Sequence, residues 1–267
     1  MAIPRVVWQT WKSAMLPPPI AMDRVRMQAE NSDYVFELAS DSDCAAFVRE
    51  EMPSEVAEAY FLISPAFGAL RADLWRYCVL YVYGGVYLDI DATLLKPVAS
   101  WLGSDDSGVL FIDDWQDMTA SDEVVLKAIE FPLERIPPGL CASRLAQYAM
   151  AFEPGHPFLK EVIGRVERAI RFHIWDVDST DPTIDEGLPG YMVTGYRAHN
   201  LTGPGIWTNS IRHVLNESAA SFRVLNDLDA CGYRGIVEPK GHSTGELNWS
   251  DVATPLYSEG TMPLSGW

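Results

Sequence analysis

Residues 71–91 read RADLWRYCVLYVYGGVYLDID. The apolar run up to Tyr83 ends at Gly84-Gly85, and glycine directly after such a run is typical of a helix end. Ser64-Pro65, a capping residue followed by proline, predicts that this helix begins there. After the glycines, Val86-Tyr87-Leu88 is short and apolar, as expected of a buried strand. The stretch therefore predicts a buried helix that turns tightly into a strand ending at Asp89-Ile90-Asp91.

The residues before this stretch predict a layered α/β arrangement. A strand is expected at 5–10 and a helix at 20–30, followed by a strand at 34–38 and a helix that begins near Cys44. Asp41, Ser42 and Asp43 are candidates for the N-cap of that second helix. Alternation of strands and helices indicates an α/β fold whose sheet is mostly parallel.

The second half of the chain continues this pattern less clearly. We expect strands at 108–112 and 148–152, a helix at 157–172 and a shorter helix at 205–215. Residues 241–267 are rich in Ser, Thr, Gly and Pro without periodicity, which predicts a loop that closes over a ligand.

Composition excludes several classes of protein. The 267 residues carry 20 Lys and Arg against 37 Asp and Glu, a net charge of −17, and so acidic a chain is a poor partner for nucleic acid. The four cysteines lack close spacing, which argues against a zinc ribbon or a disulfide framework. The sequence predicts neither a signal peptide nor a transmembrane segment. A soluble cytoplasmic protein is expected, with peripheral attachment to a membrane as an alternative.

The acidic residues of the deciding stretch indicate a cation site. Asp89 and Asp91 are two apart at the end of a strand, so they project from one side, and a hard divalent ion is the natural partner of two such carboxylates. Asp73 and Arg76 are three apart and share one helix face. Two ordinary explanations stay open, since Asp73 and Arg76 can form a surface ion pair and the two aspartates can cap a turn.

The stretch from Arg71 to Asp91 resembles the signature of glycosyltransferases with a DXD sugar-binding motif. This family includes fungal initiating mannosyltransferases and bacterial capsular-polysaccharide transferases, and it is distantly similar to large glucosylating bacterial toxins. Three further blocks resemble family blocks in the same order: IPRVVWQTWK at 3–12, EPGHP at 153–157 and TGPG at 202–205.

The resemblance implies one catalytic domain of GT-A type over residues 1–267. Residues 1–100 would form the nucleotide-sugar and metal half, 101–240 the acceptor half, and 241–267 the loop over the site. The implied reaction is polysaccharide biosynthesis, in which a hexose moves from a UDP- or GDP-linked donor to a glycan or other hydroxyl acceptor. It would need Mn²⁺ or Mg²⁺ and proceed with retention of configuration.

The resemblance also assigns roles to residues. Asp91 would bind the metal directly, and Asp89 would reach the ribose, or the metal through a water. Asp73 and Arg76 would hold hydroxyls of the donor sugar. The remaining donor residues would be Trp8, stacking on the base, together with Gln9, Thr10 and Trp249, while His242 would complete the metal site.

One departure and several tryptophans complete these expectations. Where many relatives carry paired Asn residues, this chain reads Ser-Arg-Leu-Ala-Gln at 143–147, so that function is expected to be fulfilled differently. Trp75 is expected in the core, because aromatic side chains are core fillers first. Trp207, like Trp249, is expected at the rim of the sugar site.

For the chemical step, a metal at the Asp89/Asp91 pair would stabilise the departing diphosphate, with Arg76 as a second positive contact. We favour attack on the same face of the sugar, with the leaving phosphate accepting the proton. The alternative is a carboxylate nucleophile, for which Asp113 and Asp114 are the candidates.

Two other functions remain open from the sequence. LDIDATLL at 88–95 also resembles the nucleophile loop of haloacid-dehalogenase-type phosphatases, in which Asp89 would be phosphorylated. A non-catalytic glycan-binding protein with the same fold is the second alternative.

Overall fold

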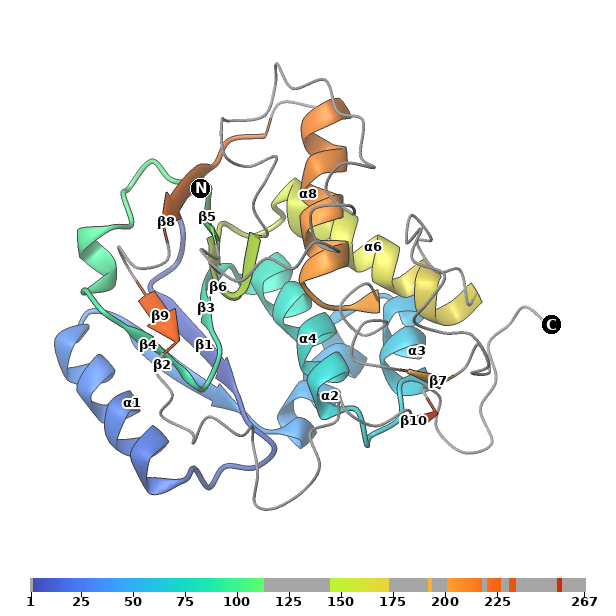
Figure 1. Cartoon of the computed structure of the whole chain (residues 1–267), viewed down its shortest axis with the longest axis horizontal. Coiled ribbons are helices and arrows are strands. Elements are labelled where there is room, and N and C mark those ends of the chain that lie inside the picture. Colours follow the sequence, from blue (N-terminus) through green and yellow to red (C-terminus); the bar gives the residue numbers. More distant parts are fainter. Residues whose placement is uncertain are drawn as a thin grey trace, which may run out of the picture.

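The computed structural model describes residues 2–112, 145–172, 192–193, 201–217, 220–226, 231–233 and 254–255. A six-stranded sheet forms its centre (Figure 1), with strand order β2-β1-β3-β6-β5-β8. The strands are β1 (Val6–Thr10), β2 (Val35–Ala39), β3 (Gly85–Leu88), β5 (Gly108–Ile112), β6 (Leu145–Phe152) and β8 (Arg223–Asn226). Three of the five neighbouring pairs are parallel, and β6 runs antiparallel to both β3 and β5. The predicted α/β class with a mostly parallel sheet is confirmed.

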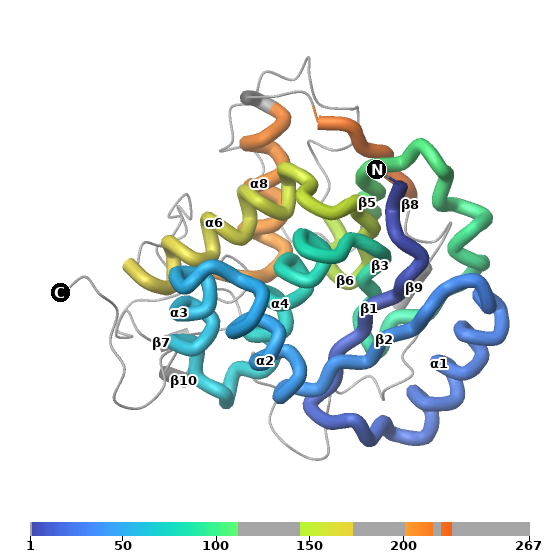
Figure 2. The backbone as a smooth tube through the Cα atoms, turned by 180° about the vertical axis from the view of Figure 1, so that it is seen from behind, coloured from blue at the N-terminus to red at the C-terminus, as the bar shows by residue number. Residues whose placement is uncertain are grey.

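Helices cover both faces of this sheet (Figures 1 and 2). On one face lies α1 (Pro18–Glu30), and the other carries α2 (Asp41–Glu51), α3 (Ser54–Leu62), α4 (Gly68–Tyr83), α6 (Pro157–Phe172) and α8 (Pro204–Glu217). Alternate residues of β3 therefore enter different cores. Val86 and Leu88 pack with Met27 of α1, whereas Tyr87 packs with the helices of the opposite face.

Two small sheets and one short helix complete the described structure. Strand β4 (Ala92–Leu94) pairs antiparallel with β9 (Cys231–Tyr233), and β7 (Met192–Val193) pairs with β10 (Thr254–Pro255). The 3₁₀ helix η1 (Val98–Ser100) follows β4. Residues 241–267, expected as a loop, thus include a two-residue strand, and the rest of that segment lies outside the described residues.

Several predicted helix starts were wrong. Helix α4 begins at Gly68, because Ser64-Pro65 instead forms a turn in which the Phe67 N–H donates to the Ser64 carbonyl at 2.9 Å. Proline after the first turn residue suits that geometry as well as it suits a helix start. Helix α2 is capped by Ser40, in a reciprocal capping box with Asp43, so none of the three predicted residues is its N-cap. Helix α3 was not predicted.

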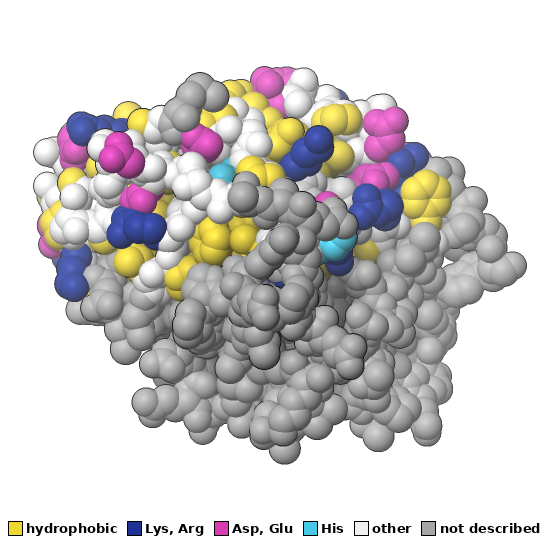
Figure 3. All heavy atoms as spheres, turned by 90° about the horizontal axis from the view of Figure 1, so that it is seen from above, with side chains coloured by type: hydrophobic (Ala, Val, Ile, Leu, Met, Phe, Trp, Pro, Cys, Tyr) yellow, Lys and Arg dark blue, Asp and Glu magenta, His cyan; other side chains and the backbone are white. Residues whose placement is uncertain are grey.

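The surface and the helices of the described residues show two further features. Among the described residues on the face seen in Figure 3, acidic and basic side chains are interspersed among hydrophobic ones, so their acidic side chains form no single block. No helix within the described ranges is both long enough and apolar enough to cross a bilayer.

The two glycines between α4 and β3 are required by conformation and by space. Gly84 has φ +66° and Gly85 φ +109°, values that favour glycine. A Cβ on Gly84 would lie 2.8 Å from the Phe152 carbonyl oxygen, and one on Gly85 would lie 2.8 Å from that of Val6. The chain therefore reverses from helix to central strand in direct contact with both neighbouring strands.

We expect Gly84→Ala to lower the free energy of unfolding by about 3 kcal/mol or more, because strained backbone and overpacking both contribute. Gly155→Ala is the matched control, since Gly155 has φ +74° but no atom within 4 Å of its added Cβ. It should cost only about 1–2 kcal/mol. Urea unfolding measures both, and equal losses would contradict the crowding argument.

His156, from the EPGHP block, lies at the start of α6 in its neutral form. Its Nδ1 accepts the Phe158 N–H at 3.3 Å, and its Nε2 lies 3.2 Å from the Ser221 carbonyl, to which it donates. Burial lowers the pKa of His156, against the opposing effects of the Ser221 carbonyl and Glu153. A proton on Nδ1 would break the bond to Phe158, so the fold binds the neutral ring.

This arrangement predicts a pH dependence of stability. A folded-state pKa below the unfolded value of about 6.5 means that stability is lost as the pH falls through that region. Replacement of His156 by Gln should reduce the loss in free energy of unfolding between about pH 7.5 and pH 5.5. At each pH, urea unfolding gives the difference in free energy of unfolding between variant and wild type. The contributions of the other titrating groups cancel in this difference. An unchanged slope in His156→Gln would refute the prediction.

Candidate functional site

The carboxyl end of β3 and the first half of α4 meet at one edge of the sheet. The tight reversal at Gly84-Gly85 makes α4 run back along β3, so residues early in the helix reach the end of the strand. Arg76 Nη2 lies 3.0 Å from Asp73 Oδ1, and its Nη1 lies 3.1 Å from Asp89 Oδ1. Three residues predicted from the sequence as site residues are thus joined by one guanidinium.

The Arg76 guanidinium is held inside the protein. Its side chain is 7% exposed, its Nη1 also donates to the Gln147 carbonyl at 3.2 Å, and it lies 4.6 Å from the centre of the Tyr87 ring. Burial acts to lower the pKa of Arg76, but the neighbouring Asp89, Tyr87 and Asp73 outweigh it and raise the pKa. The pair with Asp73 is therefore a buried one, and the surface ion pair is excluded.

Burial and the hydrogen-bonding partners of Asp73 shift its pKa in opposite directions. Its carboxylate is 14% exposed and accepts the Thr202 hydroxyl on Oδ2 at 2.8 Å. Burial raises the pKa of Asp73 to about 6, although Arg76 and Thr202 act to lower it. Asp73 is therefore ionised at neutral pH, at a cost to stability that disappears as the pH falls below about 6.

Thr202, from the TGPG block before α8, is a residue whose contact with the site the sequence did not predict. Its carbonyl accepts hydrogen bonds from the Tyr77 hydroxyl and from Gln147 Nε2, both at 2.9 Å. Gln147 belongs to the stretch 143–147, in which the resemblance led us to expect paired Asn residues. The departure from the family pattern thus coincides with an amide that holds the turn bearing Thr202.

The Asp89–Ala92 turn carries the second acidic residue of the pair. Asp89 is fixed by its backbone, since its N–H donates to the Tyr148 carbonyl at 2.7 Å and its carbonyl accepts the Ala92 N–H at 3.1 Å. Asp89 Oδ1 also accepts the Tyr87 hydroxyl at 2.6 Å. Asp91 lies in the turn, partly exposed.

The chemistry of these donors fits a hard divalent cation. No group of three or more His, Cys, Asp or Glu side chains able to hold a metal occurs within the described ranges. Mg²⁺, however, is usually held by one or two carboxylates together with substrate phosphates, and not by a cage of protein ligands alone. Oδ1 of Asp89 is shared by Tyr87 and Arg76, and the partly exposed Asp91 lies two residues further along the same turn.

The predicted residues of β1 contact protein groups away from this cluster. The Trp8 indole donates to the Gly84 carbonyl at 2.8 Å and stacks on Tyr83, at the opposite end of β3. Gln9 is fully buried and accepts from Arg24 Nε at 3.1 Å. The Thr10 hydroxyl donates to the Ala39 carbonyl at 3.0 Å. Their roles toward a donor stay predictions.

Of the tryptophan predictions, one is confirmed and one was wrong. Trp75 is buried in the core, as expected. Trp207 is fully buried in α8 and stacks on Tyr77 with ring centres 5.4 Å apart, so the prediction that it lies at the rim of the sugar site was wrong. Its place between Ile206 and Ile211 on one helix was the available signal. His242, Trp249, Asp113 and Asp114 lie outside the described residues.

Comparison with known proteins supports the resemblance. A family model for the glycosyltransferase sugar-binding region containing the DXD motif matches residues 21–107, which include Asp73, Arg76, Asp89 and Asp91. The initiation-specific alpha-1,6-mannosyltransferase of Candida albicans is 27% identical over 252 residues, 84% of this chain and 56% of that protein. Inositol phosphoceramide mannosyltransferase 3 of Schizosaccharomyces pombe is 27% identical over 176 residues, 64% of this chain and 40% of that protein.

One solved structure, the PaToxG glycosyltransferase, is 11% identical with a TM-score of 0.49, over 79% of this chain and 69% of that chain. The chain spans about half the length of the curated relatives that it matches along most of its own length. By its sequence, the chain thus matches the DXD-containing sugar-binding region of glycosyltransferases over residues 21–107, and it is similar to fungal mannosyltransferases along most of its length.

Proposed function

We propose that this protein transfers a hexose from a nucleotide-diphosphate donor to a glycan or other hydroxyl acceptor, with a divalent cation and with retention of configuration. The names of both curated relatives above specify mannosyl transfer, so a mannosyl donor is our first choice. UDP- and GDP-linked donors are both compatible with the described residues.

The observation that carries the proposal is the charge balance at the end of β3. Among the described residues, Asp73 and Asp89 share Arg76, so these three ionised groups carry one surplus negative charge, and Asp91 follows two residues after Asp89. Such a surplus favours a bound cation, and a diphosphate leaving group needs one too. A single divalent ion satisfies both requirements, which explains how so acidic a protein would bind an anionic donor.

Asp73, Asp89 and Asp91 would have different roles in binding the cation and the donor. When bound, the cation would supply Lewis-acid stabilisation of the leaving diphosphate. Asp91 would hold it, and Asp89 would be kept in orientation by Tyr87 and Arg76. Asp73, fixed by Arg76 and Thr202, would accept hydrogen bonds from hydroxyls of the donor sugar.

Arg76 is better suited to arranging these acids than to meeting the phosphate. Its guanidinium is enclosed and shared among Asp73, Asp89 and the Gln147 carbonyl. We therefore propose that it contributes by positioning two carboxylates, in place of the phosphate contact expected from the sequence.

For retention we favour attack on the same face of the sugar ring. The bond from the acceptor oxygen to the anomeric carbon forms as the bond to the phosphate oxygen breaks, and the acceptor proton passes to the departing phosphate. A carboxylate nucleophile is the alternative. Asp73 and Asp89 are both bound to Arg76, which lowers their nucleophilicity, and the candidates expected from the sequence for that route, Asp113 and Asp114, lie outside the described residues.

The same contacts weigh against the phosphatase. A nucleophilic Asp89 would attack the phosphorus atom with a carboxylate oxygen, and the contacts of its Oδ1 with Tyr87 and Arg76 make this carboxylate a weaker nucleophile. Hydrolysis of p-nitrophenyl phosphate that requires Asp89 would instead favour that function. Donor binding without any turnover would favour the glycan-binding alternative.

The direct experiment is a panel of nucleotide sugars screened for sugar release with and without Mn²⁺. We expect turnover of one donor that depends on Mn²⁺, and a loss of about 100-fold or more in kcat/KM for Asp91→Asn. Asp33→Asn, which removes an exposed partner of Arg5, is the control. Metal-independent turnover, or full activity in Asp91→Asn, would overturn the proposal.

The buried triad makes a separate prediction about stability. Arg76→Gln should lower the free energy of unfolding by about 2–4 kcal/mol, because it leaves two largely but not fully buried carboxylates without their cation. Adding Asp73→Asn should restore part of this loss, since one of the two charges is then removed. Urea unfolding of the single and double variants tests this, and purely additive losses would contradict it.

A further inference from the structure

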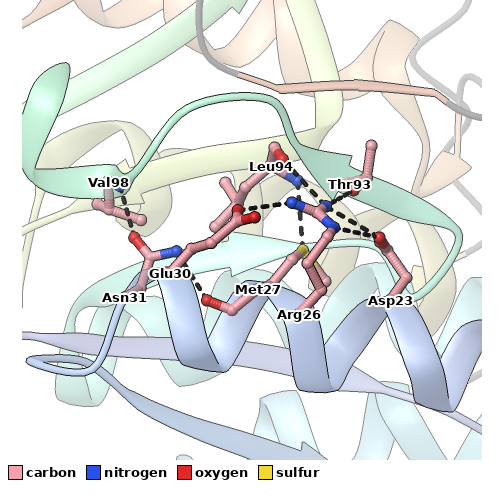
Figure 4. Close-up of polar contacts among 8 residues, drawn as sticks. All are labelled: Asp23, Arg26, Met27, Glu30, Asn31, Thr93, Leu94 and Val98. Atoms are coloured by element: carbon pink, nitrogen blue, oxygen red, sulfur yellow. Dashed lines mark hydrogen bonds and ion pairs between the residues drawn. The ribbon is translucent and has the colours of Figure 1, made fainter.

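Helix α1 holds the chain immediately after the acidic turn (Figure 4). Arg26 Nη2 donates to the Thr93 hydroxyl at 2.6 Å and to the Leu94 carbonyl at 3.2 Å. Both acceptors belong to β4, which begins at the residue after Asp91. Thr93, only two residues beyond Asp91, is fully buried, so the contact is shielded from water on the side of β4.

The Arg26 guanidinium is itself held in place from both sides. Its Nε donates to Asp23 Oδ1 at 2.9 Å, and its Nη1 donates to Glu30 Oε2 at 2.6 Å. These carboxylates lie one turn before and one turn after Arg26 on the same helix. The planar fork is therefore oriented before it meets β4, which lowers the entropic cost of that contact.

Two neighbours on α1 extend the contact along the chain. The Leu94 N–H points at Met27 Sδ, 3.2 Å away, and the Val98 N–H donates to Asn31 Oδ1 at 2.7 Å. Asn31 Nδ2 in turn donates to the Met27 carbonyl at 2.8 Å. Residues 93–98 are thus fastened to α1 at several points, as Figure 4 shows.

The two acids of the turn are consequently fixed by different parts of the protein. Asp89 is held from the opposite face of the sheet, by Tyr87 and by Arg76 of α4. Asp91 lies between that anchor and the strand held by α1. The spacing of the two carboxylates therefore depends on Arg26 as well as on Arg76.

We propose that Arg26 is a positioning residue for Asp91: by holding β4, it keeps Asp91 in place in the metal site. This proposal rests on the proposed function. Mg²⁺ demands near-ideal geometry, and with few protein ligands a small displacement of one carboxylate removes much of the affinity. Groups that orient metal ligands typically change metal affinity 10–100-fold when mutated.

The test measures Mn²⁺ binding directly, from the electron paramagnetic resonance signal of free Mn²⁺ during titration of the full chain with GDP or UDP present. Arg26→Gln should weaken Mn²⁺ binding by about 10-fold or more, with Arg26→Lys in between, since lysine lacks the fork. Thr93→Val, which removes one acceptor and keeps the shape, should weaken it in the same direction and provides a test if Arg26→Gln does not fold.

Arg171→Gln is the matched control. Arg171 also pairs with an acid of its own helix, Glu167, and bridges to another element through Glu58 at 2.8 Å, but it lies on α6. Its Mn²⁺ affinity should equal that of wild type. If Arg26→Gln bound Mn²⁺ as tightly as wild type, or if Arg171→Gln lost as much Mn²⁺ affinity as Arg26→Gln, the role of Arg26 would be refuted while the proposed function would stand. A wild-type protein that binds no Mn²⁺ would overturn the proposed function with it.

Discussion

One buried guanidinium ties the main helix of this protein to its central strand. Arg76 satisfies Asp73 on its own helix and Asp89 at the end of β3, and neither acid is readily buried without it. The contact exists only because Gly84 and Gly85 reverse the chain within two residues, which lays α4 back along β3. Backbone conformation at one end of the strand thus determines which charges meet at the other.

Local patterns predicted much of this arrangement. The glycine pair marked the end of α4, the apolar run after it marked β3, and the period of residues 157–172 predicted α6 with its observed bounds. Predictions failed where one residue pair suits two structures. Ser64-Pro65 fits a helix start and a turn equally well, and only the packing of the following residues decides for the turn.

Long-range contacts were the harder part of the site. The spacing of Asp73 and Arg76 predicted that they share a helix face, yet nothing in it indicates that Thr202, 129 residues later, donates to Asp73. Tryptophans were equally ambiguous. An indole serves as a sugar platform or as core filling, and for Trp207 the burial in α8 decides for the core.

In the acidic turn, one arginine mainly stabilises the fold and another mainly sets the geometry of the site. Asp89 is bound to Arg76, which α4 encloses, so removal of Arg76 leaves largely buried charge behind. Asp91 is partly exposed and depends on β4, which α1 fastens through Arg26 on the other face of the sheet. Arg26 is more than one-third exposed on its helix, so water can replace part of what it provides to the fold. Water cannot replace the spacing it imposes, because only a fixed β4 keeps the second carboxylate at a set distance from the first.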